Sequence, residues 1–212
     1  MKHTMKKLNF LFVALIIGLG FTSCMKDNDF EPYDPQKYFD LEAPILKAYV
    51  DTAEGLGDLA TLDETGIWYV IEEAGLQDTE DPDFYEYNFN SNGQLEMPEV
   101  TVNYIGRLVP NGTVFNDFED QTFSLASLLG GWQVAFFPEN MKDRDGDVVV
   151  DQNGDPRKIG ITALGLQKGS KIRIVMPSPY GYQSQSREGI PANSPLDFYI
   201  EVLEVNPPSS PY

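Results

Sequence analysis

The chain contains 212 residues, of which 33 are acidic and 15 basic, and its formal net charge is −18. This length suffices for one domain of ordinary size with extensions and a substantial hydrophobic core. Such an acidic surface repels phosphate backbones, so nucleic acid is excluded from the expected partners.

The N-terminus has the pattern of a bacterial export signal. Lys6 and Lys7 precede an apolar run over residues 8–20, which is shorter than the roughly 20 residues that a membrane-spanning helix needs. The run leads into Phe-Thr-Ser before Cys24, which resembles a lipobox with phenylalanine in place of the usual leucine. We expect residues 1–23 to be a lipoprotein signal peptide and Cys24 to carry lipid. The alternative is a plain secretory signal that leaves one free thiol.

Removal of this signal would limit the chemistry open to the rest of the chain. His3 is the only histidine and Cys24 the only cysteine, so the mature, lipidated chain would contain neither imidazole nor free thiol. That composition excludes Ser-His-Asp and Cys-His catalysis and argues against a zinc site. No metal or cofactor is expected. The lipid is expected to be the only membrane contact, anchoring the protein in the cell envelope, at the periplasmic face or the cell surface of the outer membrane.

Residues 24–60 are expected to form a spacer followed by one short helix. The spacer, up to about Gln36, is acidic and contains two prolines. Apolar residues then follow helical spacing, at Leu41, Ile45, Leu46, Tyr49 and Val50. Because proline is tolerated only in the first turn of a helix, we expect Pro44 to lie there and the helix to end near Gly55.

Four segments are predicted to be strands, because their apolar residues alternate or cluster between turn residues. They comprise residues 67–74, 99–109, 171–176 and 196–205. After the second of them, the Pro-Asn-Gly sequence at 110–112 predicts a hairpin turn into a further strand that contains Val114 and Phe115.

Two segments in the second half interrupt this strand pattern. Residues 123–137 contain a double glycine, which predicts a strand or turn and then a short helix starting near Gly131. Residues 141–158 place two acidic turn clusters around three valines, which predicts a solvated hairpin. Their Asp-Arg-Asp-Gly-Asp sequence faintly resembles a calcium loop, but Val148 stands where the EF-hand pattern requires glycine.

The connection between the last two strands is rich in aromatic and branched apolar residues. It carries Tyr180, Tyr182, Ile190 and Pro191. Loops usually expose polar residues, and an apolar loop held between two strands is a candidate wall for a ligand pocket.

Taken in order, the motifs VTVNYIGRL, NGTVF, TFSL, LLGGW, LQKGSKIRIVMP, PYGY and GIPANSPLDFYIEVLEV resemble the FKBP-type peptidyl-prolyl cis-trans isomerases. The resemblance runs from Gly66 to Val205. It implies an α+β fold in which a twisted antiparallel sheet wraps around one short helix, with the pocket between them. The expected isomerase domain comprises residues 61–205, with an insertion at about 138–160 and a frayed tail over 206–212.

The same resemblance assigns roles to individual residues. It implies catalytic roles for Phe115, Asn116, the backbone amide of Leu129 and the hydroxyl of Tyr182, the last two holding the substrate carbonyl. The substrate-binding residues that it implies are Tyr104, Phe123, Leu128, Trp132, Ile190 and Phe198. Asn116 stands where the family usually has aspartate, and the two leucines replace a usual Val-Ile pair. Taken singly, an aromatic residue at each of four of these positions is more often a core residue than a ligand contact, namely Tyr104, Phe115, Trp132 and Phe198.

Rotation about an X–Pro bond suits a site without ionisable groups. The barrier of about 18–20 kcal/mol comes from amide resonance, and crossing it requires neither a nucleophile nor net proton transfer. The expected function is therefore a prolyl isomerase that acts on proline-containing polypeptides during the folding of exported proteins. The alternative is a lipoprotein that binds polypeptide or another ligand on the same fold without turnover.

Overall fold

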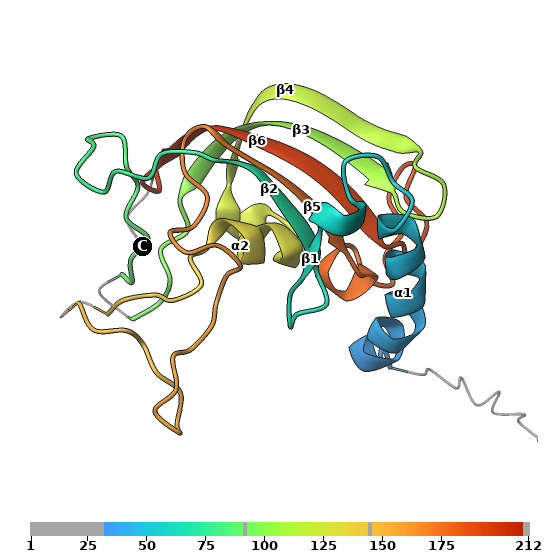
Figure 1. Ribbon diagram of the computed structural model, residues 1–212, viewed down its shortest axis with the longest axis horizontal. Helices are drawn as coiled ribbons and strands as arrows, with labels where there is room; N and C mark the ends of the chain where they lie inside the picture. The colour runs from blue at the N-terminus through green and yellow to red at the C-terminus, as the bar shows by residue number, and fades with distance from the viewer. Residues whose placement is uncertain (1–31, 91–92, 144–145, 210–212) are drawn as a thin grey trace, which may run out of the picture. The chain divides into compact units, whose positions relative to one another are not determined.

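The computed structural model describes residues 32–90, 93–143 and 146–209 (Figure 1). The expected signal peptide and Cys24 lie outside the described residues, as does the end of the tail. Within the described ranges, every helix is too short or too polar to cross a membrane.

Six antiparallel strands form one sheet with the order β1-β2-β5-β6-β3-β4. The strands are β1 (Thr61–Leu62), β2 (Trp68–Ala74), β3 (Glu99–Leu108), β4 (Val114–Ser124), β5 (Ser170–Met176) and β6 (Leu196–Asn206). The four strands predicted from alternation agree with β2, β3, β5 and β6 to within one residue at each end. The Pro-Asn-Gly turn joins β3 to β4 as expected, and β4 continues much farther than its first two residues.

A short helix, α2 (Gly130–Phe136), packs against one face of this sheet, as Figure 1 shows. Trp132 and Phe136 of the helix are buried together with Ile172, Ile174 and other residues of the central strands. The helix approaches β5 so closely that a Cβ atom at Gly131 would lie 2.3 Å from the sulfur of Met176. The predicted α+β class, with a sheet around one short helix, is confirmed.

A second helix, α1 (Pro35–Val50), packs against the opposite face of the sheet. Its Leu46 and Val50 form a separate buried cluster with Val175 of β5, whereas the neighbouring Ile174 belongs to the core around α2. Successive strand residues point to opposite faces. The two helices therefore cover the two faces of β5.

The expectation that Pro44 lies in the first turn of its helix was wrong. The helix begins nine residues earlier, at Pro35, where proline is favoured. Asp34 caps it by accepting hydrogen bonds from the amides of Gln36 and Lys37. Pro44 is exposed inside the helix, so the carbonyl that loses its hydrogen bond can be solvated, and burial of the following turn outweighs the local cost. The helix ends at Val50 rather than near Gly55.

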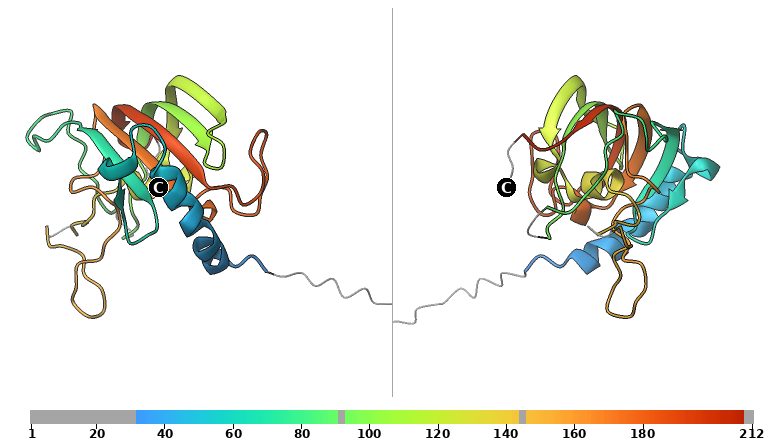
Figure 2. Two further views of the ribbon diagram at one scale, coloured as in Figure 1. Left: turned by 45° about the vertical axis from the view of Figure 1, so that its right-hand side comes forward. Right: turned by 90° about the vertical axis from the view of Figure 1, so that its left-hand side faces the viewer.

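Residues 138–160, which we call the excursion, lie between α2 and β5 in the chain and extend away from the sheet (Figure 2). Isolated bridges pair Lys142 with Val148 and Val150 with Pro156. The excursion is therefore a meander of three short segments with two turns, and the expectation of a single hairpin was only partly correct.

Three 3₁₀ turns complete the described elements: η1 (Gly57–Leu59), η2 (Leu125–Ser127) and η3 (Ser178–Tyr180). The turn η2 leads into α2, and η3 opens the connection between β5 and β6. We call this connection, residues 177–195, the site loop.

Candidate active site

Four aromatic residues from four different elements meet on the α2 side of the sheet. We call Tyr104, Phe115, Trp132 and Phe198 the aromatic cluster. Ring centroids lie 5.3 Å apart for Tyr104 and Trp132, 5.3 Å for Trp132 and Phe198, and 5.6 Å for Phe115 and Phe198. All three pairs are close to perpendicular, an arrangement that favours aromatic contact. Trp132 and Phe198 are buried, and the other two are partly exposed, so the cluster has a closed floor and an accessible side.

The position of Phe115 depends on an irregularity in the sheet. Arg107 pairs with Val114 and Gly106 with Asn116, which leaves Phe115 as the extra residue of a bulge. A Cβ atom at Gly106 would lie 2.6 Å from the ring of Phe115 and 2.9 Å from that of Phe198. Glycine is therefore required for these rings to meet. Gly106 was not among the residues predicted from the sequence, although a glycine inside a strand is a recognised signal of a bulge or a close approach.

Polar groups border the aromatic cluster on the β4 side. The amide of Asn116 donates a long hydrogen bond of 3.4 Å to the hydroxyl of Tyr104. Burial raises the pKa of Tyr104, the nearby Tyr182 raises it further, and the hydrogen bond from Asn116 opposes both effects. These three residues therefore share one environment, in which the hydroxyl of Tyr104 remains protonated at physiological pH and can donate a hydrogen bond.

The site loop is held by hydrogen bonds within itself. The carbonyl of Gln183 accepts from the amide of Asn193, and Arg187 and Ile190 exchange two backbone hydrogen bonds. The guanidinium of Arg187 lies 5.3 Å from the ring centre of Tyr182, within the range of a cation–π contact. Ile190 is buried and Tyr182 packs against the core. Both predicted residues of this loop thus face the same core as the aromatic cluster.

The turn before α2 leaves one backbone donor available. The side chain of Gln133 fixes this turn by donating to the carbonyls of Leu125 and Leu128. The carbonyl of Leu129 accepts from the amides of Trp132 and Gln133 as the helix begins. The amide of Leu129 itself donates to no acceptor within the described ranges. It is therefore free to bind the carbonyl of a ligand.

The structure brings the predicted site residues together around one core. Trp132, Ile190 and Phe198 are buried members of it, and Asn116 lies at its edge through Tyr104. The predicted residues that are partly buried against it are Tyr104, Phe115, Phe123, Leu128, Leu129 and Tyr182. Phe123 contacts Tyr104, with ring centroids 6.1 Å apart. Their roles in binding and catalysis remain predictions.

Two further aromatic residues adjoin this group, of which Phe118 was not predicted as functional and Tyr180 was predicted only as part of the apolar loop between the last two strands. Phe118 of β4 is 46% exposed and lies 5.7 Å from Tyr104 between ring centroids. Tyr180 of η3 approaches the start of α2 so closely that a Cβ atom at Gly130 would lie 3.4 Å from its ring. The sequence shows an aromatic residue in a strand at one position and in a loop at the other. Only the strand register and the path of the site loop bring these two residues to the site.

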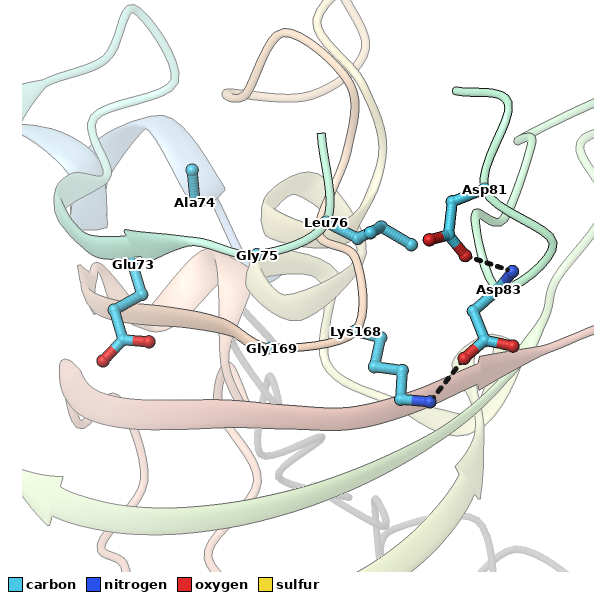
Figure 3. A pocket seen from close by; sticks show the side chains of 8 residues that line it. All are labelled: Glu73, Ala74, Gly75, Leu76, Asp81, Asp83, Lys168 and Gly169. Carbon is cyan, nitrogen blue, oxygen red and sulfur yellow. Dashed lines mark hydrogen bonds and ion pairs between the residues drawn. The ribbon is translucent and has the colours of Figure 1, made fainter. Parts of the chain in front are cut away.

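Several cavities in the described part of the chain lie away from the aromatic cluster. Figure 3 shows one of about 680 Å³, where the end of β2 approaches a polar loop. Its lining includes Lys168, whose ammonium group pairs with Asp83 at 2.6 Å. Four of its eight lining residues are charged and its ion pair is exposed, so it resembles solvated surface more than a binding site. Within the described ranges, no group of three or more histidine, cysteine or acidic residues is placed to hold a metal ion.

Comparison with known proteins identifies the family. A sequence model described as FKBP-type peptidyl-prolyl cis-trans isomerase matches residues 94–203. The chain is 27% identical over 146 residues to the FKBP-type peptidyl-prolyl cis-trans isomerase FkpA of Escherichia coli, with 68% of this chain and 39% of that protein covered. It is 43% identical over 107 residues to FK506-binding protein 4 of Candida glabrata, with 50% and 21% covered. The crystal structure of FkpA from Escherichia coli has a TM-score of 0.49 and 24% identity, with 81% of this chain and 62% of that chain covered.

The chain spans less than half the length of these curated relatives. The family match, however, covers more than half of this chain and includes the whole aromatic cluster and the whole site loop. The chain belongs to the FKBP-type peptidyl-prolyl cis-trans isomerase family.

Proposed function

We propose that the protein is a peptidyl-prolyl cis-trans isomerase that acts on proline-containing polypeptides. One observation carries the proposal: Tyr182 and Leu129, whose backbone amide has no acceptor in the described part of the chain, both pack against the core that contains the aromatic cluster. An apolar surface suits the proline ring, and two hydrogen-bond donors suit the carbonyl oxygen of the residue before it.

The chemistry follows from the electronic structure of the X–Pro amide. Resonance separates charge in the planar amide, and water stabilises that separation; the twisted transition state has less of it. A dry aromatic surface therefore favours the twisted state relative to the planar one, compared with water. No bond is made or broken and no proton changes place. An acceleration of about 10⁶ requires roughly 8 kcal/mol of differential stabilisation.

The hydrogen-bond donors have a positioning role in this mechanism. The amide of Leu129 and the hydroxyl of Tyr182 would hold the substrate carbonyl while the prolyl side of the bond rotates. Asn116 offers a neutral amide where the family usually has a carboxylate, and its contact with Tyr104 keeps that side of the site polar. This substitution is the observation that favours a second candidate, a polypeptide-binding protein without turnover.

We further propose that the protein works at the bacterial cell envelope, where it assists the folding of exported proteins. The support is the sequence of residues 1–24, with its basic start, apolar run and single cysteine. Residues 61–205 would then be the isomerase domain, held away from the membrane by the segment that follows Cys24. Incorporation of labelled fatty acid that is lost in Cys24→Ala would support the anchor, and equal labelling of both proteins would contradict it.

The activity is tested by measuring prolyl-peptide isomerisation with the full-length chain in mild detergent. We expect the wild-type protein to accelerate the reaction well above the spontaneous rate. Phe115→Ala removes an accessible ring of the cluster and should lower kcat/KM at least tenfold. Tyr182→Phe keeps the ring, removes only the hydroxyl and should lower kcat/KM about tenfold, or about 1.4 kcal/mol.

Tyr199→Phe is the matched control for the hydroxyl. Tyr199 follows Phe198 on β6 and faces the opposite side of the sheet, where its pKa is raised by burial and by nearby acidic groups. Its hydroxyl is remote from the cluster, so kcat/KM should change less than twofold. A folded wild-type sample that leaves the spontaneous rate unchanged would exclude the enzyme, and peptide binding by that sample would support the second candidate.

A further inference from the structure

A buried carboxylate of α1 contacts the first turn of the site loop. Glu42 is only 4% exposed, and its two oxygens accept hydrogen bonds from the backbone amide and the hydroxyl of Ser178, each 2.6 Å long. Ser178 is fully buried and is the first residue of η3. Glu42 and Ser178 are 136 residues apart in the sequence, so this contact joins the N-terminal extension directly to the loop that carries Tyr182.

The charge of Glu42 does not account for its burial. Within the described ranges no cation lies within ion-pair distance of it, and burial raises the pKa of the carboxyl group although both Ser178 hydrogen bonds lower it. Burying a carboxylate without a counter-ion costs stability that an apolar residue would not. What a carboxylate supplies here is direction, because two acceptor oxygens fix both donors of one serine at once.

Ser178 in turn fixes the residues on both sides of Tyr182. Its carbonyl accepts hydrogen bonds from the amide of Gly181, at 2.9 Å, and from the amide of Gln183, at 3.0 Å. Gln183 has a positive φ of 55°, a conformation that non-glycine residues adopt only where the surroundings enforce it. The donors of Ser178 thus bind α1, and its acceptor holds the turn that carries Tyr182.

A second contact of α1 connects the helix to the turn that contains the backbone amide of Leu129. The rings of Phe39 and Tyr180 meet edge to face, with centroids 5.7 Å apart. Tyr180 also lies against Gly130 at the start of α2, and Gly130 directly follows Leu129. The helix α1 therefore supports the loop next to Tyr182 and the turn next to the free amide.

We propose that Glu42 is a positioning residue for prolyl isomerisation, and that α1 is a working part of the site. By fixing Ser178, Glu42 holds the Gly181–Gln183 turn in the one conformation that presents the Tyr182 hydroxyl to substrate. The inference rests on the proposed isomerase function, and it adds to that function a residue that does not touch the substrate.

The test compares three variants of the full-length chain in prolyl-peptide turnover. Glu42→Ala removes both acceptors and should lower kcat/KM at least tenfold. Glu42→Gln should restore it to within threefold of wild type, because the amide oxygen can accept from the backbone of Ser178 while its NH₂ group donates to a reoriented serine hydroxyl. Ser178→Ala keeps one of the two hydrogen bonds, so its loss should lie between those of the other two.

Tyr49→Phe is the control for a general loosening of α1. The hydroxyl of Tyr49 donates to the buried Asp197 at 2.6 Å, so its removal weakens the docking of the same helix while leaving the Ser178 contact intact. Asp197 keeps its ion pair with Arg173 at 2.7 Å. Turnover by Tyr49→Phe should stay within twofold of wild type, even where its thermal midpoint falls as far as that of Glu42→Ala.

Amide hydrogen exchange supplies a measurement that does not depend on turnover. Glu42→Ala should speed exchange at Ser178, Gly181 and Gln183, whereas Tyr49→Phe should leave all three protected. Equal exchange in the two variants, or wild-type turnover in Glu42→Ala, would overturn the inference while leaving the isomerase function intact. A folded wild-type protein without turnover would overturn the proposed function itself.

Discussion

The site loop and the excursion are both irregular, yet the structure holds them by different means. The site loop begins and ends with buried residues, Ser178 at one end and Pro195 at the other, and Ile190 is buried between them. In the excursion, the described residues between Lys142 and Lys158 are exposed apart from a half-buried Val149. Of these two segments, the site loop therefore makes the greater buried contact with the core.

The excursion takes its shape from local hydrogen bonds instead. In its first turn a carboxylate oxygen of Asp143 accepts from the amide of Asp147. In its second turn Asp151 accepts from the amides of Asn153 and Asp155. Such Asx turns form between residues a few positions apart and need no tertiary support. A segment built this way can vary without disturbing the core, whereas the site loop cannot.

Among the variants that test this comparison, Trp132→Ala is expected to have the largest effect on stability. The indole is 2% exposed and contacts Tyr104 and Phe198, so its removal leaves a cavity under the cluster and should lower the free energy of unfolding by about 3–5 kcal/mol. Urea unfolding followed by circular dichroism measures the change. Val150→Ala in the excursion is the control, since Val150 is 51% exposed and should shift stability by less than about 0.5 kcal/mol. Similar losses in the two variants would refute the contrast.

A smaller effect is expected at the ion pair that links the excursion to the turn before β2. The ammonium group of Lys158 lies 2.6 Å from Asp63, which is buried in the turn before β2. Lys158→Met keeps the aliphatic stem but leaves a buried carboxylate without its counter-ion. Because the side chain of Lys158 is about one-third exposed, the expected loss is modest, about 1 kcal/mol at pH 7. Lys142→Met, at an exposed position of the same excursion, should be neutral in the same unfolding measurement.

The sequence predicted most of the sheet because alternation reports burial directly. In β3, and in β6 as far as Val202, every second residue faces the core, and the strand bounds followed from that pattern. The same local reasoning misplaced the start of α1. The cost of Pro44 is local, but the stabilisation that outweighs it comes from Leu46 and Val50 packing on a strand more than a hundred residues away. Pairings of that kind are absent from a local pattern.

The candidate site shows the same division. Motif order located the apolar site residues, and the structure places them around one core. Glu42 could not be found that way, because an acidic residue on a helix is normally solvated and its partner Ser178 is distant in sequence. Gly106 did carry a signal, as a glycine in a strand, but its meaning depends on which rings cross it.

The pH dependence of stability separates the two anchors, because their carboxyl groups have opposite pKa shifts. Burial raises the pKa of Asp63, but its hydrogen bonds, chiefly that from Lys158, outweigh burial and leave the pKa below the ordinary 3.8. Burial raises the pKa of Glu42 above its ordinary 4.5. Asp63 therefore stabilises the fold above pH 3.8, and this contribution is lost as the pH falls through the folded-state pKa. The contribution of Glu42 is complete below pH 4.5 and is lost as the pH rises through its folded-state pKa.

Unfolding of Asp63→Asn and Glu42→Gln between pH 3 and pH 8 measures the two contributions. Relative to wild type, Asp63→Asn should be less stable at pH 7, and this deficit should shrink below pH 3.8. Glu42→Gln should gain stability relative to wild type as the pH rises above 4.5. Parallel curves for wild type and both variants would show that neither carboxyl group changes its pKa on folding.

The smallest effect is expected from shortening the excursion. Replacing residues 142–156 by Asn-Gly keeps the buried Met141 and the anchor Lys158, and it joins the chain where Asn140 and Lys158 already form a bridge. An Asn-Gly pair suits a two-residue connection between antiparallel segments, and the lower entropic cost of closing a shorter loop offsets the removal of a few exposed side chains. The free energy of unfolding should change by less than about 1 kcal/mol, and kcat/KM on short prolyl peptides by less than twofold. A tenfold loss of kcat/KM without loss of stability would instead place the excursion over the aromatic cluster as part of the substrate-binding surface, since nothing else in the shortened chain would have changed.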